Sequence, residues 1–360
     1  MIEVGANRKI VFDPSLREKR NYIKQHDMTD WDLNNYETID VTFNNKKRKL
    51  YKNFNFSIFV DDYCNADCKF CVAQLRYQHK NQMYNKQHIK DKDEYLNRLD
   101  FVLQQIRPLN PSISLTGGEP TLSPIFVDIL KLVDKYNFRK RTVTTNGSAL
   151  LNTMNNDTII NHLINYKWDH LNISRVSHDD IINRRIMNYN IDEEYCTVDM
   201  LSEILSTIKD TNLSHRLSCL LLQESVNSVD KIKEYVDYYN NIGANNFIFR
   251  ELMDYDKSAI NTEKMKYCDE NKIKLYDIWN DFQKYPEFIP YLNILGYYYY
   301  VEIYKYNDCT IASESADLNL QYRERELHPD VIYEMVFHNN GNLCGSWIDT
   351  EDILLPYNQF

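Results

Sequence analysis

The sequence predicts an α/β fold, in which six strand–helix units form a partial (βα)6 barrel and a C-terminal α+β extension follows. Short apolar segments alternate strictly with amphipathic ones between Phe56 and Arg250, an order typical of βαβ units and a parallel sheet. Right-handed crossovers curl such units into an open barrel. The most distinctive motifs of the chain follow expected strands, at the end of a βα barrel where functional sites lie.

Each expected element is supported by its own hydrophobic pattern. The strands are short apolar runs, and the helices repeat apolar residues every three or four positions, which places those residues on one side. In the first helix, Tyr95, Leu99 and Val102 share such a side. The expected strands are 56–60, 113–115, 141–145, 170–174, 216–222 and 247–250, and the expected helices are 93–106, 122–136, one from about 157, 198–208 and 229–242.

Composition and charge argue against several classes of partner. The net charge is −10, and hydrophobic residues make up 43% of the chain, which is enough for a large core. No apolar run approaches the roughly 18 residues of a membrane span, so no membrane partner is expected. The basic run Asn45–Lys49 is interpreted as a solvated turn, so no nucleic acid is expected either. No secretory signal is evident, and a cytoplasmic location with reduced cysteines is expected.

Three closely spaced cysteines, Cys64, Cys68 and Cys71, stand out in the string CNADCKFC. A cubane iron–sulfur cluster normally takes four cysteine thiolates, one for each iron. A triplet leaves one iron open, as a catalytic zinc keeps one position open for a reacting ligand. The C-x3-C-x2-C spacing therefore predicts a metal site at which something other than protein binds, and hence chemistry rather than storage.

Other roles for these cysteines are weaker hypotheses. A zinc site usually takes four protein ligands, and His79 offers a fourth, eight residues after Cys71. Packing in a core strand is disfavoured, because Asn65, Asp67 and Lys69 lie between the cysteines. Disulfides need an oxidising compartment, which nothing in the sequence indicates.

A second motif lies about 45 residues further on, in SISLTGGEPTLSP (Ser112–Pro124). The pattern predicts a short buried strand, a sharp turn at Thr116–Pro120 and the start of a helix. Two glycines in the turn let the backbone approach a ligand closely, and the turn carbonyls can accept hydrogen bonds from a cationic amine. The turn alone is weak evidence, but its order and its separation from the cysteine triplet make the pair a specific signal.

Together the two motifs resemble those of radical S-adenosylmethionine (SAM) enzymes, and the resemblance spans roughly Asn55–Tyr255. It implies that Cys64, Cys68 and Cys71 hold a [4Fe-4S] cluster, whose fourth iron is chelated by the amino and carboxylate groups of SAM. The cluster, reduced by a protein such as flavodoxin or ferredoxin, cleaves SAM to methionine and a 5′-deoxyadenosyl radical that abstracts hydrogen from the substrate. The cofactor supplies this chemistry and the protein positions it. Catalytic residues beyond the cluster ligands are not identified by the resemblance.

The same resemblance assigns SAM contacts to residues at strand ends. Phe70 matches an aromatic position near the adenine, and a loop aromatic that shields the cluster is the alternative. Gly117, Gly118 and Glu119 would meet the SAM amino group. Asn146 and Ser174 lie where relatives contact the SAM carboxylate or ribose, with an ordinary Asn-Gly turn as the alternative for Asn146. The expected SAM-binding residues are Phe70, Thr116, Gly117, Gly118, Glu119, Asn146, Ser174 and Met253, the last packing on SAM.

The ending Phe249–Met253 of the sixth strand resembles that of the branch containing the molybdenum-cofactor GTP cyclase and peptide maturases. The cyclase's GTP-binding cations, however, would fall at Asp62, Ser114 and Leu217, none of which can neutralise a triphosphate. Its C-terminal second cluster and glycine-rich tail are also missing. The chain is therefore nearest to this branch without being that cyclase.

The C-terminal region is expected to close the open barrel and to shape the substrate pocket, which would exclude water from the radical. A helical pattern covers 263–285, and a strand pair is expected over 331–347, turned at 339–342. Cys309 and Cys344 are placed similarly to the ends of auxiliary-cluster domains, but such domains need more cysteines at tighter spacing. The expected domains are an N-terminal extension (1–52), a radical SAM core (53–255) and a C-terminal capping region (256–360).

The sequence thus predicts a radical SAM enzyme that acts on a small molecule such as a nucleoside, sugar or amino acid. A peptide substrate is the second hypothesis, although no leader-peptide module is evident. A non-catalytic iron–sulfur or zinc protein is the third, and the GGEP turn argues against it because a structural metal site does not need an amine-binding turn. Four cations near the barrel mouth are candidates to hold an anionic substrate, with ordinary surface salt bridges as the alternative: Arg175, His178, Arg184 and Arg250.

Overall fold

The structure is a computed structural model that describes most of the chain. His79, the possible fourth zinc ligand, lies outside the described residues. No helix in the described part of the chain is long and apolar enough to span a membrane. The described residues are 3–9, 29–31, 37–75, 88–253, 263–296 and 298–359.

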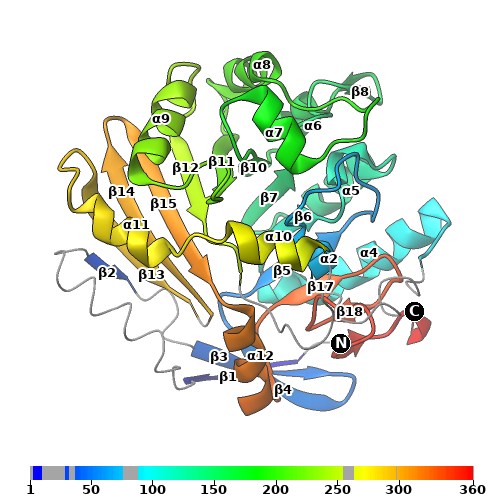
Figure 1. The fold of residues 1–360 in the computed structure, drawn as a ribbon. Helices are drawn as coiled ribbons and strands as arrows, with labels where there is room; N and C mark the ends of the chain where they lie inside the picture. The colour runs from blue at the N-terminus through cyan, green and yellow to red at the C-terminus, as the bar shows by residue number, and fades with distance from the viewer. Residues whose placement is uncertain are drawn as a thin grey trace.

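Six parallel strands lie side by side in chain order and form the centre of the main sheet (Figure 1). Each pairs with the next as a parallel neighbour. In the described part of the chain this sheet does not close on itself, so the α/β fold with a partial barrel is confirmed. The six strands are β5 (Asn55–Phe59), β6 (Ser112–Thr116), β7 (Lys140–Thr145), β10 (His170–Ser174), β11 (Ser214–Leu220) and β12 (Asn246–Arg250).

Helices connect these strands and lie along the outer face of the sheet (Figure 1). Several begin at a residue whose side chain accepts a hydrogen bond from the first turn, as Asp91, Thr197 and Ser228 do. Such caps typically stabilise a helix start by about 1 kcal/mol. The helices are α4 (Lys92–Ile106), α5 (Phe126–Asp134), α6 (Ile159–Asn165), α7 (Asp180–Met187), α8 (Val198–Ile208) and α9 (Val229–Asn240).

The helix expected over 122–136 is shorter than its hydrophobic pattern suggests. Ser123 is extended, with a ψ of 131°, and α5 starts only after Ile125. The cause is Pro124, because a proline disfavours the helical conformation of the residue before it.

The short helix α7 was not expected from the sequence. Shorter elements nearby are α2 (Val72–Leu75), η1 (Arg107–Leu109), η2 (Pro120–Leu122), β8 (Thr153–Met154) and β9 (Asp157–Thr158).

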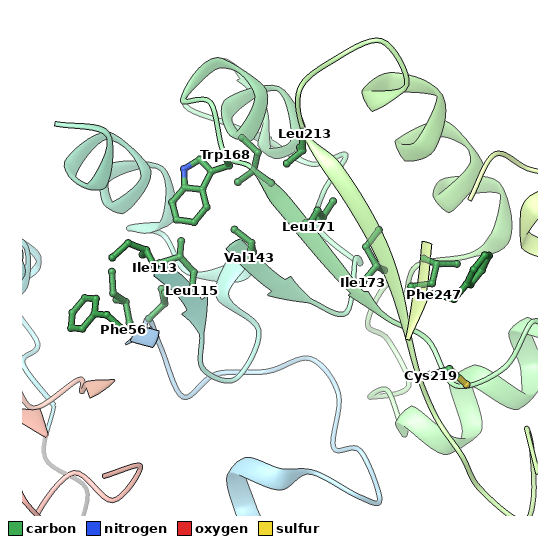
Figure 2. Close-up of a cluster of buried hydrophobic side chains, with 14 of the residues drawn as sticks. Phe56, Ile113, Leu115, Val143, Trp168, Leu171, Ile173, Leu213, Cys219 and Phe247 are labelled. Carbon is green, nitrogen blue, oxygen red and sulfur yellow. The ribbon is translucent and has the colours of Figure 1, made fainter. Parts of the chain in front are cut away.

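The two faces of the core strands differ in chemistry. On the outer face, Ile113, Val143 and Leu171 are fully buried in the layer between the strands and the helices (Figure 2). Successive side chains of a strand point to opposite faces, so the alternate residues face the inside of the barrel. These inner residues are mostly small or polar and only partly buried, as Ser114 and Thr144 are. The outer face therefore holds the sheet to its helices and leaves a polar interior.

The C-terminal region extends the core sheet at the edge formed by β12. Strand β15 (Cys309–Ala316) pairs in parallel with β12, with Arg250 directly opposite Glu314. Two antiparallel strands, β14 (Tyr299–Tyr306) and β13 (Ile289–Leu295), continue the sheet beyond it. These three strands were not expected from the sequence.

The C-terminal region also extends the opposite edge of the core sheet, which is formed by β5. Its elements are α10 (Glu263–Asn271), α11 (Leu275–Phe282), α12 (Leu318–Leu327), β17 (Met335–Phe337), β18 (Leu343–Cys344), β19 (Ile353–Leu355) and η3 (Tyr357–Gln359). Strand β17 pairs in parallel with β5, and β18 and β19 follow in antiparallel order. The strand pair expected over 331–347 is therefore confirmed. The helical pattern over 263–285 corresponds to two helices, α10 and α11, rather than one.

A second, smaller sheet contains the N-terminal strands. Its order is β1 (Glu3–Lys9), β3 (Glu37–Phe43), β4 (Lys46–Tyr51) and β16 (Val331–Ile332), while β2 (Thr29–Trp31) pairs with β13. Strands β3 and β4 form a hairpin turned at Asn44 and Asn45, which both have positive φ angles. Asparagine tolerates this conformation better than most residues, which explains the tight turn.

The basic run Asn45–Lys49 is mostly strand β4 rather than a solvated turn. Two of its charges are paired, Arg48 with Asp352 and Lys49 with Asp330, both at 2.8 Å. The run therefore helps to attach the small sheet to C-terminal segments.

Arg98 of α4 ties the C-terminal segment to the core. Its buried guanidinium donates hydrogen bonds to the backbone oxygens of Gly341, Leu355 and Pro356 at 2.9, 3.1 and 2.9 Å. Because Arg98→Ala removes these donors and leaves a cavity, we expect the free energy of unfolding to fall by about 2–4 kcal/mol. Urea unfolding followed by circular dichroism measures this change. Arg139→Ala, on the exposed surface, is the control, and an equal loss in both variants would argue against the tether.

Candidate functional site

The cysteine loop (Asp61–Cys71) follows β5 and contains all three cysteines, Cys64, Cys68 and Cys71. All three cysteines are half-buried and line one cavity of about 710 Å³. Burial raises the pKa of the Cys64 thiol to about 11 and also raises the pKa of Cys68, so both thiols are protonated near neutral pH. A metal ion that binds here must displace these protons, as at any thiolate site.

The GGEP turn lies directly against the cysteine loop. The amide of Gly118 donates to the carbonyl of Asp61, and the amide of Glu119 donates to that of Tyr63, both at 2.7 Å. A Cβ atom on Gly118 would lie 2.1 Å from the Tyr63 oxygen, and one on Gly117 would lie 2.4 Å from the Asp61 oxygen. Atoms cannot approach so closely, so both positions require glycine. The glycines that were expected to let a ligand approach the backbone therefore also let the chain's own cysteine loop pack against the turn.

The Glu119 carboxylate joins the turn to the end of β7. It accepts hydrogen bonds from the amide and hydroxyl of Thr121 (3.1 and 2.6 Å), the hydroxyl of Thr145 (2.6 Å) and the amide of Asn146 (2.6 Å). Burial raises the pKa of this carboxyl group, and the four donors act in the opposite direction. The side chain expected to meet the SAM amino group is therefore already engaged within the protein, where it positions the turn.

Asn146 connects β7 back to the cysteine loop. Its side-chain amide donates to the side-chain oxygen of Asn65 at 2.8 Å, and its own side-chain oxygen accepts from the Ser148 amide at 2.9 Å. Asn65 donates in turn to the Ser148 hydroxyl at 3.0 Å. The ordinary Asn-Gly turn considered for this position is present, with a φ of 83° at Gly147. One buried network thus joins the ends of β5, β6 and β7.

Every expected site residue lies on the wall of the same cavity. Phe70 packs with Cys64 and Cys68 in an apolar group that also contains Met253. Ser174, at the end of β10, is half-buried. The expected residues on the cavity wall are Cys64, Cys68, Cys71, Phe70, Thr116, Gly117, Gly118, Glu119, Asn146, Ser174 and Met253. Their contacts with SAM stay a prediction.

The structure contradicts a substrate-binding role for Arg175. This side chain points away from the cavity and is fully buried. Its guanidinium donates to the hydroxyl of Tyr239, the carbonyl of Cys196 and the carboxylate of Asp180. Arg175 therefore holds the segments around α7 and α9 together.

Two further cations considered for the substrate, His178 and Arg184, also lie off the cavity wall. His178 lies 3.3 Å from the carboxylate of Glu234, and Arg184 stacks on an aromatic ring. Ordinary surface contacts, the alternative for this group, therefore account for both. Arg250 is the one member of the group that lines the cavity.

Several cavity residues come from the C-terminal region and were not found from the sequence. They include Tyr298, Glu314, Leu318 and Trp347, together with Cys268 of α10. Nothing in their local sequence marks them as site residues, because they reach the cavity only through strand pairings across the fold. Their position supports the expectation that the C-terminal region shapes the pocket.

The three cysteines suit an iron–sulfur cluster better than a single ion. Among the described residues, no three His, Cys, Asp or Glu side chains converge on one point where an ion could be held. In a [4Fe-4S] cluster each thiolate binds a different iron, so the three sulfur atoms need not converge. Soft thiolate ligands on one cavity wall are the donor set that iron–sulfur chemistry requires.

Residues 58–213 match the family model described as the Radical SAM superfamily. This part of the chain is a radical SAM domain. The match supports the expected enzyme class and the expected cofactors, a [4Fe-4S] cluster and SAM. The particular branch within the superfamily is not identified by this match. No curated protein matches the chain.

Solved structures similar to this chain include native anSMEcpe with bound AdoMet, with 18% identity, a TM-score of 0.43 and coverage of 64% of this chain. The chain spans 61% of the length of that protein. A second is TsrM from Kitasatospora setae, a radical SAM methyltransferase with tryptophan and a SAM analog bound (11% identity, TM-score 0.39, 55% of this chain and 36% of that chain). A third is a domain of pyruvate-formate lyase-activating enzyme from Bacteroides vulgatus (16% identity, TM-score 0.31, 51% of this chain and 99% of that chain).

Gly118→Ala tests whether the contact between turn and loop positions the site. The new methyl group would collide with the Tyr63 carbonyl, next to Cys64, so we expect less iron after reconstitution and SAM binding weakened about tenfold, the effect of ~1.4 kcal/mol of strain. Iron analysis and equilibrium dialysis with SAM measure both quantities. Gly243→Ala is the control, because Gly243 has open space at its Cβ position; its positive φ, which Gly118 does not share, strains the backbone without any collision. If both variants bind iron and SAM as the wild type does, the contact does not position the site.

Proposed function

We propose that this protein is a radical SAM enzyme that cleaves SAM reductively and directs the 5′-deoxyadenosyl radical to a hydrogen atom of a small-molecule substrate. The observation that carries the proposal is the pair of backbone hydrogen bonds between the cysteine loop and the GGEP turn. Through them, a cluster-binding triplet and a turn suited to an amine share one wall of a cavity of about 710 Å³. A structural metal site would need neither the turn nor the cavity.

When bound, the cluster supplies SAM with one electron, which we propose comes from a reductant such as flavodoxin or ferredoxin. The chain's own part is to hold three of the irons through Cys64, Cys68 and Cys71 and to orient SAM. The carbonyl oxygens of Gly117 and Gly118 accept no hydrogen bond from the residues that the structure describes, so they are available to the SAM ammonium group. Backbone carbonyls held in place in this way can orient a ligand without reorganisation.

The shape of the cavity favours a small substrate. Its volume lies within the roughly 300–1,000 Å³ of typical small-molecule sites. Apolar side chains such as Leu220, Leu252 and Trp347 contribute to its wall and help to exclude water from a radical. Asp62 lies on the cavity wall at the position where the molybdenum-cofactor GTP cyclase has a cation. A carboxylate there would repel a triphosphate, which argues against GTP as the substrate.

The test is anaerobic reconstitution with iron and sulfide, reduction with dithionite, and chromatography for 5′-deoxyadenosine after SAM is added. We expect the wild type to form this product and Cys68→Ala to form none above background, because the cluster loses a ligand. Cys219→Ala is the matched control, since this thiol is buried on the outer face of β11, away from the cavity, and it should retain iron and cleavage.

Two results would contradict the proposal. Cleavage that persists in Cys68→Ala would show that the triplet does not hold the reactive cluster. Stoichiometric zinc with no iron–sulfur absorption in the wild type would show a different metal site.

A further inference from the structure

Charged side chains of β11, β12 and β15 lie close together inside the barrel. Arg250 of β12 is the one cationic side chain among the described residues that line the cavity. Its Nε donates to Oε1 of Glu314 at 3.0 Å, and its Nη1 donates to the hydroxyl of Ser218 at 3.1 Å. Within the described part of the chain its Nη2 has no hydrogen-bond partner, so this group can bind a ligand.

A second arginine lies one layer deeper in the barrel, below the residues that line the cavity. Arg216 comes two positions before Ser218 on β11, so both side chains point to the inside. Its Nε donates to the side-chain oxygen of Asn172 at 3.0 Å, and no carboxylate in the described ranges lies at ion-pair distance from it. Burial, and then the neighbouring charge of Arg250, lower the pKa of Arg216 to about 10. The Arg216 guanidinium is therefore still positively charged near neutral pH, at a position where no described carboxylate pairs with it.

The carboxylates on the cavity wall do not supply that charge. Asp62 lies 3.0 Å from His88, and Glu251 lies 3.8 Å from Lys272. The carboxylate of the GGEP turn is surrounded by its four donors, as described above. Among the described residues, Glu314 alone faces the arginines, so two cations share one anion. A partly buried cation that lacks a counter-charge is unfavourable, and an anionic ligand would relieve this.

We propose that the substrate carries a carboxylate or phosphate group that binds Arg250 beside Ser218, with the charge of Arg216 beneath them. This inference rests on the proposed function and names the chemical class of its substrate. The planar guanidinium groups of arginine suit either anion, because two parallel N–H groups can meet two oxygens. Glu314 stays on the opposite side of Arg250, where it fixes the guanidinium and limits the negative charge that the site accepts.

The arginine pair is separate from the GGEP turn, the place expected for the SAM amino group. The GGEP turn and the cysteine loop lie at the ends of β6 and β5, whereas Arg250 ends β12, four strands away from β6 in the sheet. Neighbouring strands are about 4.8 Å apart, so the separation along the sheet is about 19 Å. The cavity reaches from one place to the other, which leaves room for a second ligand beside SAM. Ser174, expected to contact the SAM carboxylate or ribose, pairs directly with Ser218, so the anion site has to be tested on the SAM-loaded protein.

Isothermal titration calorimetry with two probes, inorganic phosphate and acetate, tests the proposal on the reconstituted, SAM-loaded protein. We expect at least one probe to bind the wild type and to bind Arg250→Gln and Arg216→Gln about ten- to hundredfold more weakly. Preference for phosphate would indicate a phosphate-bearing substrate, and preference for acetate a carboxylate. Arg185→Gln is the control, because this arginine is exposed and pairs with Glu224 outside the cavity.

Three results would overturn the proposal. They are equal probe affinity in all four proteins, no binding of either probe to the wild type, and binding that occurs only when SAM is absent. The last would mean that the arginines hold the SAM carboxylate. Circular dichroism and iron content show whether each variant is folded. If Arg250→Gln does not fold, Arg250→Lys replaces it, because lysine keeps the positive charge but lacks the two parallel N–H groups of arginine.

Probe binding and SAM cleavage are separate readouts, so the two proposals can fail separately. A wild type that cleaves SAM but binds neither probe retains the proposed function and loses the anion site. A wild type that binds a probe through both arginines but never forms 5′-deoxyadenosine retains the anion site and loses the radical reaction.

Discussion

Two backbone hydrogen bonds, from Gly118 to Asp61 and from Glu119 to Tyr63, hold the candidate site together. They join the loop after the first core strand to the turn after the second, and there is no room for a side chain at the contact. Parallel strands set side by side bring their carboxyl ends to one edge of the sheet, but only roughly. The glycine contact then fixes the cysteine loop relative to the turn, which is the precision a bound cofactor needs.

Polar side chains connect the cysteine loop and the GGEP turn to a third strand, β7. Glu119 binds the end of β7, and Asn146 of that strand end binds Asn65 of the cysteine loop. Residues that a family resemblance assigns to SAM thus also hold the protein in shape. Both roles are compatible, because the cavity wall includes Glu119 and Asn146 while their hydrogen bonds run within the protein. A buried network of this kind stabilises a single arrangement only when its members are satisfied, as Glu119 and Asn146 are.

Much of the core could be predicted because its information is local. The strands are short apolar runs, the helices have caps, and the cysteine triplet and GGEP turn are contiguous motifs. Where local pattern failed, a specific residue was responsible, such as Pro124, which delays the start of α5. The hairpin of β14 and β15 did carry a usable signal, the turn residues Asn307 and Asp308 between two tyrosine-rich or apolar runs, and Asn307 indeed adopts a positive φ there.

The rest of the site depends on pairings that no local pattern contains. Glu314 reaches Arg250 because β15 pairs with β12, and Trp347 reaches the cavity wall because β17 pairs with β5. Side-chain direction also separates the cations considered from the sequence, since Arg250 ends β12 and faces the cavity, whereas Arg175 follows β10 and points away from it. Side-chain direction on a strand alternates with each residue, so an error of one position reverses the assignment.

The most direct test of the account is Mössbauer spectroscopy of the protein reconstituted with ⁵⁷Fe, recorded with and without SAM. A [4Fe-4S] cluster held by three cysteines has one iron without a protein ligand, so the account predicts that SAM changes the signal of one iron in four. A spectrum that SAM leaves unchanged would contradict it, because the cysteine loop and the GGEP turn would then not form a common site for the cluster and SAM.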